Sequence, residues 1–257
     1  MTAESREALL KTILLASAAI GALMVGGAAY AADLPASAPV YKATPMAPAF
    51  SWAGFYLGIE GGGAWGKSRQ RSDVGDIAPG FNLSGGLVGG TYGTNWQFGS
   101  WVLGMESDIS WSNLKGSATE GPIPANTATT KQTWVGFDRG RVGYAWDRWM
   151  VFAAGGLAES TIEAQSIGPA GSISQSKYRL GWTGGGGVEW AFAPQWSAKV
   201  EYLYADFGSH TSYLNPVPAG FTNRAGGVSL NENIVRVGIN YHYDLPGLLA
   251  RTFLGAH

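Results

Sequence analysis

The stretch Arg179–Phe192, RLGWTGGGGVEWAF, decides the fold, because its side chains alternate in polarity at every second residue. The even-numbered positions, which form one parity, hold the large apolar residues Leu180, Trp182, Val188, Trp190 and Phe192. The other parity holds Arg179, Thr183 and Glu189, with small glycines between them. A period of two is typical of a β-strand whose two faces meet different surroundings. A single strand of this kind also occurs in soluble sheets, so its repetition along the chain carries the interpretation.

The same alternation recurs along the chain and predicts a closed barrel. We expect strands at 52–65, 83–96, 101–111, 132–146, 149–160, 179–192, 196–208 and 231–243. The pattern leaves open which face of 149–160 points outward. Behind an export signal, such a series predicts an all-β protein, an eight-stranded antiparallel transmembrane up-and-down β-barrel with lipid outside and polar groups inside.

The connections between these strands alternate in length. Long polar connections are expected at 66–82, 112–131, 161–177 and 209–230, and short ones at 97–100, 147–148 and 193–195. Bacterial barrels have short periplasmic turns and long external loops. Tryptophans flank each short turn, in the pairs Trp96/Trp101, Trp146/Trp149 and Trp190/Trp196. These pairs predict an aromatic girdle at the periplasmic boundary, and Trp65, Trp111 and Trp134 predict a second girdle at the outer one.

Charged side chains on the inward parity predict a filled interior. They are Glu60, Glu106, Asp108, Arg139, Arg141, Arg179, Glu189, Lys199, Glu201 and Arg236. Buried charges are tolerated when they are paired, and an eight-stranded barrel is only wide enough for side chains to fill it. Passive diffusion of solutes is therefore not expected. Asp138 alone has lipid-facing parity, which a bulge near Gly136 or Gly140, or a position near the outer rim, would accommodate.

The N-terminal segment 1–31 has the features of a secretory signal peptide. Arg6 and Lys11 precede an uncharged run, and Ala29-Tyr30-Ala31 supplies small residues for cleavage after Ala31. The alternative is a membrane anchor, because the run approaches the roughly 20 residues that a spanning helix needs. We expect a proline-rich periplasmic lead-in at 32–51, the barrel at 52–243 and a C-terminal extension at 244–257.

Composition argues against a nucleic-acid-binding protein and against a domain held together by disulfides. The net charge is −1, which gives no bulk attraction to nucleic acid, so no nucleic-acid partner is expected. Cysteine is absent, so the exported domain must be stabilised by its backbone ladder and its packing rather than by disulfides.

Several motifs resemble ligand-binding or catalytic sites, but their sequence context favours structural roles. Gly61–Ser68 fits the phosphate-binding pattern G-x-x-x-x-G-K-[ST], yet no helical pattern follows it. The glycine run Gly184–Gly187 suggests close packing or curvature within a strand. Glu106 and Asp108 lie two residues apart and could act as acid and base, but inward arginines favour a salt-bridge network.

The last long connection and the final strand hold the remaining candidates. Asp206, Ser209, His210 and Ser212 could supply a nucleophile and a base. His210, Tyr213 and His242 are possible haem ligands, although His210 and His242 are expected at opposite ends of the barrel. These signals are weak, so we predict no catalytic, cofactor-binding or metal-binding residue.

Four stretches carry a family resemblance: WAGFYLGIEGGGAWG (52–66), VGYAWDRW (142–149), GVEWAFAPQWSAKVEYLY (187–204) and NIVRVGINYHY (233–243). They resemble the small outer-membrane β-barrel proteins of alphaproteobacteria, the opacity-like, outer membrane immunogenic or porin-family group. The resemblance implies an abundant surface protein with roles in envelope integrity, immunogenicity or, in some members, haemin binding. Such barrels usually end at an aromatic residue, whereas here DLPGLLARTFLGAH follows Tyr243.

The sequence therefore predicts a non-catalytic outer-membrane surface protein with a structural role in the envelope and a role in contact with a host or the environment. Its expected partners are the outer-membrane bilayer, lipopolysaccharide and the barrel-assembly machinery, and we expect a monomer. One alternative is a narrow pore or a haemin-binding barrel. A second is a lipid-A-modifying outer-membrane enzyme.

Overall fold

The computed structural model describes residues 50–72, 75–119, 127–169, 171–213 and 225–243, with the backbone alone at 71–72, 75–79, 173, 210–213 and 225–226. These residues belong to one compact unit spanning 47–257. The predicted signal peptide, the lead-in before Phe50 and the C-terminal extension lie outside the described residues and stay predictions. Among the described residues, no helix is long and apolar enough to cross a membrane.

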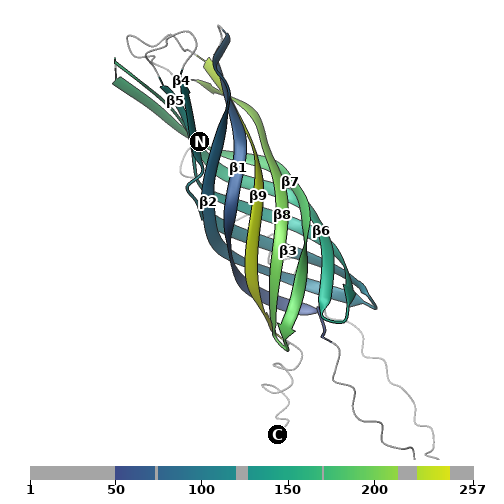
Figure 1. Ribbon diagram of the computed structural model, residues 1–257. Helices are drawn as coiled ribbons and strands as arrows, with labels where there is room; N and C mark the ends of the chain where they lie inside the picture. The colour runs from purple at the N-terminus through teal and green to yellow at the C-terminus, as the bar shows by residue number, and fades with distance from the viewer. Residues whose placement is uncertain (1–49, 73–74, 120–126, 170, 214–224, 244–257) are drawn as a thin grey trace, which may run out of the picture. The chain divides into compact units, whose positions relative to one another are not determined.

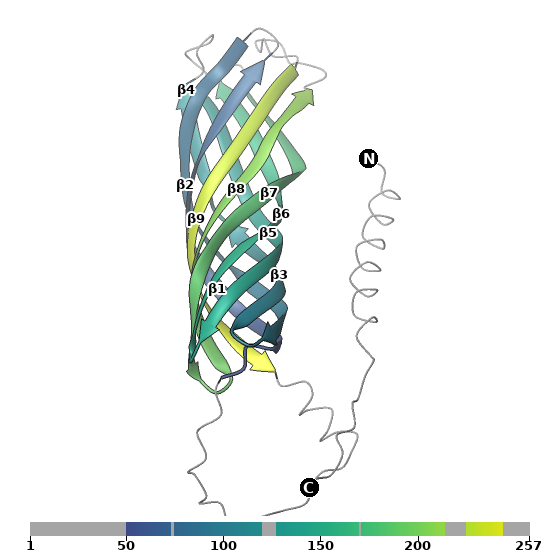
Figure 2. The same cartoon turned by 90° about the vertical axis from the view of Figure 1, so that its right-hand side faces the viewer.

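The described part of the chain is an antiparallel β-barrel (Figures 1 and 2). Its strands are β1 (Gly54–Ser72), β2 (Gly75–Phe98), β3 (Trp101–Ser112), β4 (Lys115–Thr119), β5 (Thr127–Trp146), β6 (Trp149–Gly168), β7 (Gly171–Ala193), β8 (Trp196–Tyr213) and β9 (Ala225–Tyr243). Eight of them form the closed ring β1-β2-β3-β5-β6-β7-β8-β9, because β1 pairs with both β2 and β9. The short β4 follows β3 and lies between β2 and β5. The predicted eight-stranded barrel is confirmed.

The two ends of the barrel differ in how their strands are joined. At one end, called the turn end below, two-residue turns at 99–100, 147–148 and 194–195 join neighbouring strands. Asp147 has a φ of 52° and Gly99 a φ of 61°, as tight hairpin turns require. The opposite end is called the loop end below; there two residues separate β1 from β2 and β6 from β7, and the longer connections are those from β3 to β5 and from β8 to β9. The predicted short turns at the turn end are confirmed, whereas the predicted long connections between β1 and β2 and between β6 and β7 are not.

The boundaries at the loop end were predicted wrongly. Loops were predicted at 66–82 and 161–177, whereas β1 runs to Ser72, β2 starts at Gly75, β6 runs to Gly168 and β7 starts at Gly171. Parts of 112–131 and 209–230 are also strand, in β4, β5, β8 and β9. The missed parts carry polar outward residues such as Lys67, Arg69 and Asn82, so they lack the apolar outward face that the prediction used. The backbone ladder does not need that apolar face and continues without it.

The alternation of faces is confirmed in the central part of every long strand. In β7, Leu180, Trp182 and Trp190 are exposed, whereas Arg179 and Glu189 are buried. All ten predicted inward charges are buried. The open question of β6 is answered by its burial pattern: Val151, Ala153, Gly155 and Leu157 point outward, and Met150 and Phe152 point inward.

Candidate functional site: the barrel interior and its outer surface

The middle of the interior is a layer of paired charges contributed by strands around the ring. Five carboxylates and four cations take part: Glu60, Glu106, Asp108, Glu189, Glu201, Arg139, Arg141, Lys199 and Arg236. They lie in this layer because each occupies an inward position on its strand. Sequence analysis grouped Arg179 with them. Its guanidinium instead lies nearer the loop end and donates to the backbone carbonyl of Val228.

Arg139 shows how tightly this layer is connected. Its Nη2 lies 2.5 Å from Glu106 Oε1 and 2.6 Å from Asp108 Oδ2, and its Nη1 lies 2.6 Å from Glu201 Oε1. Arg236 contacts the other oxygens of Asp108 and Glu201, each at 2.8 Å. Each guanidinium therefore bridges several carboxylates, as its planar fork of donors allows.

Glu189 forms the part of the layer nearest the turn end. It is fully buried, and its oxygens accept Arg141 Nη1 at 3.1 Å, Ser197 Oγ at 2.5 Å and Asn240 Nδ2 at 2.8 Å. His242 Nε2 lies 3.7 Å from the same carboxylate and 2.9 Å from Ser197 Oγ. The candidate haem ligand His242 is thus engaged inside the barrel.

Apolar layers lie on both sides of the charges. Toward the turn end, Trp52 packs with Met150 and Phe152. Toward the loop end, Phe137 precedes Arg139 by two residues on β5, and both Arg139 and Arg236 lie over its ring, at 5.7 and 5.5 Å from the centroid. The rest of this layer is Ala64, Phe81, Leu83, Leu87, Leu114, Ala128, Val135, Ala158, Ile162, Leu203, Ala205, Phe207, Leu230 and Ile234. Sequence analysis expected only polar groups inside and missed this layer.

Hydrogen bonds cross the interior near the loop end. Ser68 Oγ on β1 lies 3.0 Å from Thr130 Oγ1 on β5, and Gln70 Nε2 donates to the Thr129 carbonyl at 3.1 Å. β1 and β5 are not neighbours in the ring. Side chains of non-neighbouring strands therefore meet here, at the level of Phe81 and Leu230 of the apolar layer, which are the register partners of Ser68.

The motifs that resembled ligand-binding or catalytic sites belong to strands and to the packed interior. Gly61–Ser68 lies within β1, with no helix after it. Gly187 lies in close backbone contact, because a Cβ there would lie 2.2 Å from the Val200 carbonyl oxygen. Glu106 and Asp108 belong to the charge layer.

The suspected loop residues lie on β8. Gly208 has a φ of 63°, and its N–H donates to Asp206 Oδ1 at 2.8 Å. Ser209 is exposed. The side chains of His210, Ser212 and Tyr213 lie outside the described residues. Among the side chains that are described, no group of three or more His, Cys, Asp and Glu is arranged to hold a metal ion.

The outer surface carries both predicted aromatic girdles. At the turn end, Trp146 is paired in register with Trp149, whose ring stacks on that of Trp190 at 5.7 Å. Toward the loop end, Trp65 and Trp111 are exposed. Between the girdles the surface is apolar, with Ile59 at 70% and Val237 at 58% exposure. Such a band flanked by aromatics is the surface that a barrel presents to a bilayer.

Asp138 departs from this apolar band, as its parity predicted. It is exposed on the outer surface, where Ser107 Oγ donates to its Oδ1 at 2.5 Å. A register shift does lie beside Gly136, between Gln132 and Val135, but it leaves Asp138 facing outward, so the expectation that a bulge would turn this residue away from the outer surface was wrong. The neighbouring Ser107 supplies a hydrogen bond in place of water.

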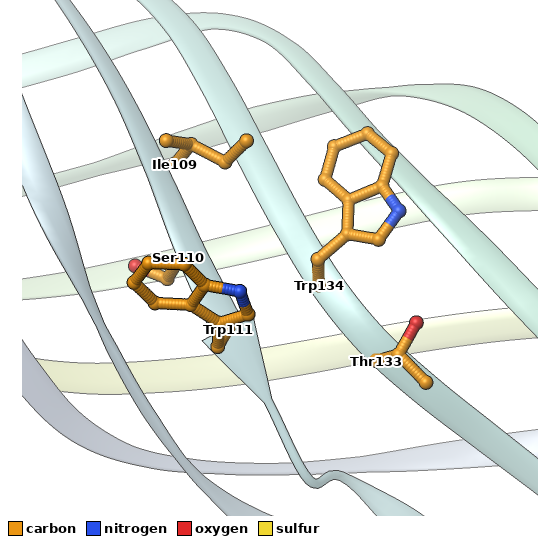
Figure 3. Close-up of a pocket in the computed structure, with 5 residues that line it drawn as sticks. All are labelled: Ile109, Ser110, Trp111, Thr133 and Trp134. Carbon is orange, nitrogen blue, oxygen red and sulfur yellow. The ribbon is translucent and has the colours of Figure 1, made fainter.

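A groove on the outer surface lies beside the same register shift. Ile109, Ser110, Trp111, Thr133 and Trp134 line a hollow of about 380 Å³ between β3 and β5. Figure 3 shows the two indole rings standing apart, with Ile109 and Thr133 toward opposite ends. Sequence analysis assigned Trp111 and Trp134 to a girdle but missed the groove, because a bulge depends on how two strands pair.

Comparisons with known proteins were consistent with this architecture. Residues 18–243 match the model of a family described as outer membrane protein beta-barrel domain. The 31 kDa outer-membrane immunogenic protein of Brucella melitensis biotype 1 is 36% identical over 249 residues, covering 91% of this chain and 100% of the relative. The 25 kDa outer-membrane immunogenic protein of Brucella abortus biovar 1 is 33% identical, covering 91% of this chain and 99% of the relative. Among solved structures, the outer membrane protein OprG from Pseudomonas aeruginosa is 12% identical with a TM-score of 0.44, covering 74% of this chain and 97% of that one.

Proposed function

Because this chain belongs to the family of outer membrane proteins with a beta-barrel domain and lies in the outer membrane, we propose that it is a non-catalytic, non-conducting structural barrel. Its role is to contribute to envelope integrity and to hold surface loops for contact with a host or the environment. It acts as a monomer, in contact with lipopolysaccharide and after insertion by the barrel-assembly machinery. The observation that carries this proposal is the buried layer of paired charges across the interior.

The charge layer opposes passage of solutes for a physical reason. A solute moving along the barrel axis has to displace side chains such as Arg139, which holds three carboxylates at 2.5 to 2.6 Å. Breaking one partner from a buried ion pair costs about 3–5 kcal/mol. The ring of Phe137 and the Trp52 cluster lie on either side of this layer. Function is therefore assigned to the outer surface and the loops.

Recording of single channels in planar bilayers tests this proposal directly. The mature protein, purified from outer membranes, is expected to give a flat trace. The double variant Glu106→Ala/Arg139→Ala, which removes a central pair, is the control that shows whether a widened barrel would be detected. Discrete conductance steps from the unmodified protein would refute the non-conducting barrel and favour the narrow pore.

Haemin binding and lipid A modification would each give a different signal. Haemin binding predicts a shift of the Soret band that weakens in His210→Ala. Modification of lipid A predicts a mass change in extracted lipid on expression, lost in Ser209→Ala or His210→Ala. The proposed structural role instead predicts that a deletion strain becomes sensitive to detergent and that both variants restore its resistance as well as the unmodified protein does.

A further inference from the structure

Three lysines occupy outward positions just beyond the loop-end tryptophan girdle. Lys67 on β1 follows Trp65 by two residues on the same face, and Lys115 lies directly opposite Lys131 in the β4–β5 pairing. β2 lies between β1 and β4, and its outward Asn82 and Ser84 face Lys67 and Lys115. The lysines therefore form one row across adjacent strands, called the lysine row below.

Two members of the lysine row, Lys67 and Lys115, have no acidic register partner in the described part of the chain. Among the described residues, no carboxylate lies within 4.0 Å of the three ammonium groups, although Glu163 on β6 is the register partner of Lys131. Like charges directly opposite each other destabilise a sheet. The Lys115–Lys131 pair therefore costs stability, which Glu163 offsets only from the Lys131 side, and an anion from outside the chain that contacts Lys115 as well would offset it further.

The position of the row identifies the kind of anion. At about 3.3 Å per residue, the lysines lie roughly 7 to 13 Å along their strands beyond the tryptophans of the girdle. Tryptophan girdles mark the level where hydrocarbon meets headgroups. The ammonium groups consequently lie at the headgroup level of the outer leaflet, where phosphate is the anion that lipids carry.

The groove between Trp111 and Trp134 provides an apolar binding surface on the side of the same lysines that faces the apolar band. These two residues are register partners on β3 and β5, but their rings are not in contact, because Trp134 stacks instead on Tyr178 at 6.2 Å. The bulge turns both Thr133 and Trp134 outward and keeps the hollow open (Figure 3). Ile109 lies toward the middle of the apolar band and Thr133 toward Lys131.

We propose that the lysine row and this groove together bind one phosphorylated glycolipid of the outer leaflet, lipid A. The phosphates contact Lys115, Lys131 and Lys67, and one acyl chain lies between Trp111 and Trp134. The exposed Asn113 lies between the lysines and the groove, at the level of the sugar. This site rests on the contact with lipopolysaccharide proposed above, and it does not depend on whether the barrel conducts.

Native mass spectrometry of the full mature barrel in detergent, titrated with purified diphosphoryl lipid A, tests the proposal. We expect one lipid to bind, and Lys115→Gln/Lys131→Gln to weaken binding roughly a hundredfold or more, since two charged hydrogen bonds to phosphate are lost. Lys115→Arg/Lys131→Arg should retain binding, and so should Arg148→Gln at the turn end. Thr133→Phe, which fills the groove and leaves every charge in place, should also weaken binding. Dephosphorylated lipid A and phosphatidylglycerol are expected to bind at least about tenfold more weakly.

Folding is measured on the same samples through heat-modifiable gel migration and urea unfolding. Without lipid A, the glutamine variant should be as stable as the unmodified barrel or more stable, because it removes a like-charge pair. A variant that loses binding because it misfolds would show the opposite change. Equal lipid A affinity in the glutamine variant and the unmodified barrel would overturn the proposal, as would equal binding of phosphatidylglycerol.

Discussion

Replacing Glu189 by alanine tests the paired interior most sharply. The carboxylate is fully buried and accepts three hydrogen bonds, from Arg141, Ser197 and Asn240. After its removal, Arg141 keeps only the longer 3.4 Å contact with Glu106 among its carboxylate partners. Removing one partner of a buried pair costs about 3–5 kcal/mol, because the other charge is left uncompensated. We expect the free energy of unfolding to fall by about that amount.

The assay is urea unfolding of the barrel refolded into lipid vesicles, with two comparison variants. Glu163→Ala, on β6 outside the charge layer, should change stability by about 0.5 kcal/mol or less, as surface substitutions do. The double variant Glu189→Leu/Arg141→Met should recover most of the loss, because an apolar replacement of a whole buried pair is often neutral. If Glu189→Ala and Glu163→Ala unfold at the same free energy, the charge layer does not stabilise the barrel as described.

Three further substitutions are tested with the same unfolding assay. Val237→Arg places a charge on the apolar band and should cost about 2–4 kcal/mol, whereas Asn231→Arg, nearer the loop end of β9, should cost about 0–1 kcal/mol; equal costs would contradict the assigned depth. Leu203→Ala removes a fully buried side chain from the apolar layer and should cost about 2–5 kcal/mol, with the exposed Val200→Ala as its control. Gly187→Ala brings a Cβ within 2.2 Å of a backbone oxygen, against 3.6 Å for Gly155→Ala; the first should cost about 1–3 kcal/mol and the second much less.

Parity was sufficient to predict the barrel and its charge layer. Glu189 and Trp190 are neighbours in sequence, yet one is buried among charges and the other is exposed on the apolar band. Two faces that meet such different surroundings leave a clear period of two in the sequence. The positions of Arg139 and Arg236 followed from the same rule, although the partners of each guanidinium did not.

The apolar interior layer escaped prediction because its strands do not place polar residues inward there: β8 is apolar on both faces, and β2 at Leu83 is apolar inward beside the polar outward residues Asn82 and Ser84. In β8, Leu203 points inward beside the outward Tyr202 and Tyr204, so polarity does not alternate there. Glu232 on β9 has inward parity and is fully buried near this layer, where Gln132 Nε2 donates to it at 3.2 Å. Glu232 lies between Asn231 and Asn233, and this polar stretch has no alternation of polarity that would predict the burial of its carboxylate. Which side chains share a layer is decided by the stagger between strands, and local sequence does not encode that stagger.

The charge layer also offers a physical reason why the barrel closes in one register. Arg236 on β9 pairs with Asp108 on β3, 128 residues away in sequence, and Arg139 pairs with Glu201, 62 residues away. A slip of one residue between neighbouring strands would turn every side chain of the slipped strand to the opposite face. Arg236 would then meet hydrocarbon, at a cost of about 2–4 kcal/mol, while Asp108 and Glu201 would lose a partner inside. Apolar inward and outward faces, such as those of β8 near Leu203, impose a much smaller penalty on the same slip. The buried ion pairs thus select the register of closure even where an apolar core of equal volume would be as stable.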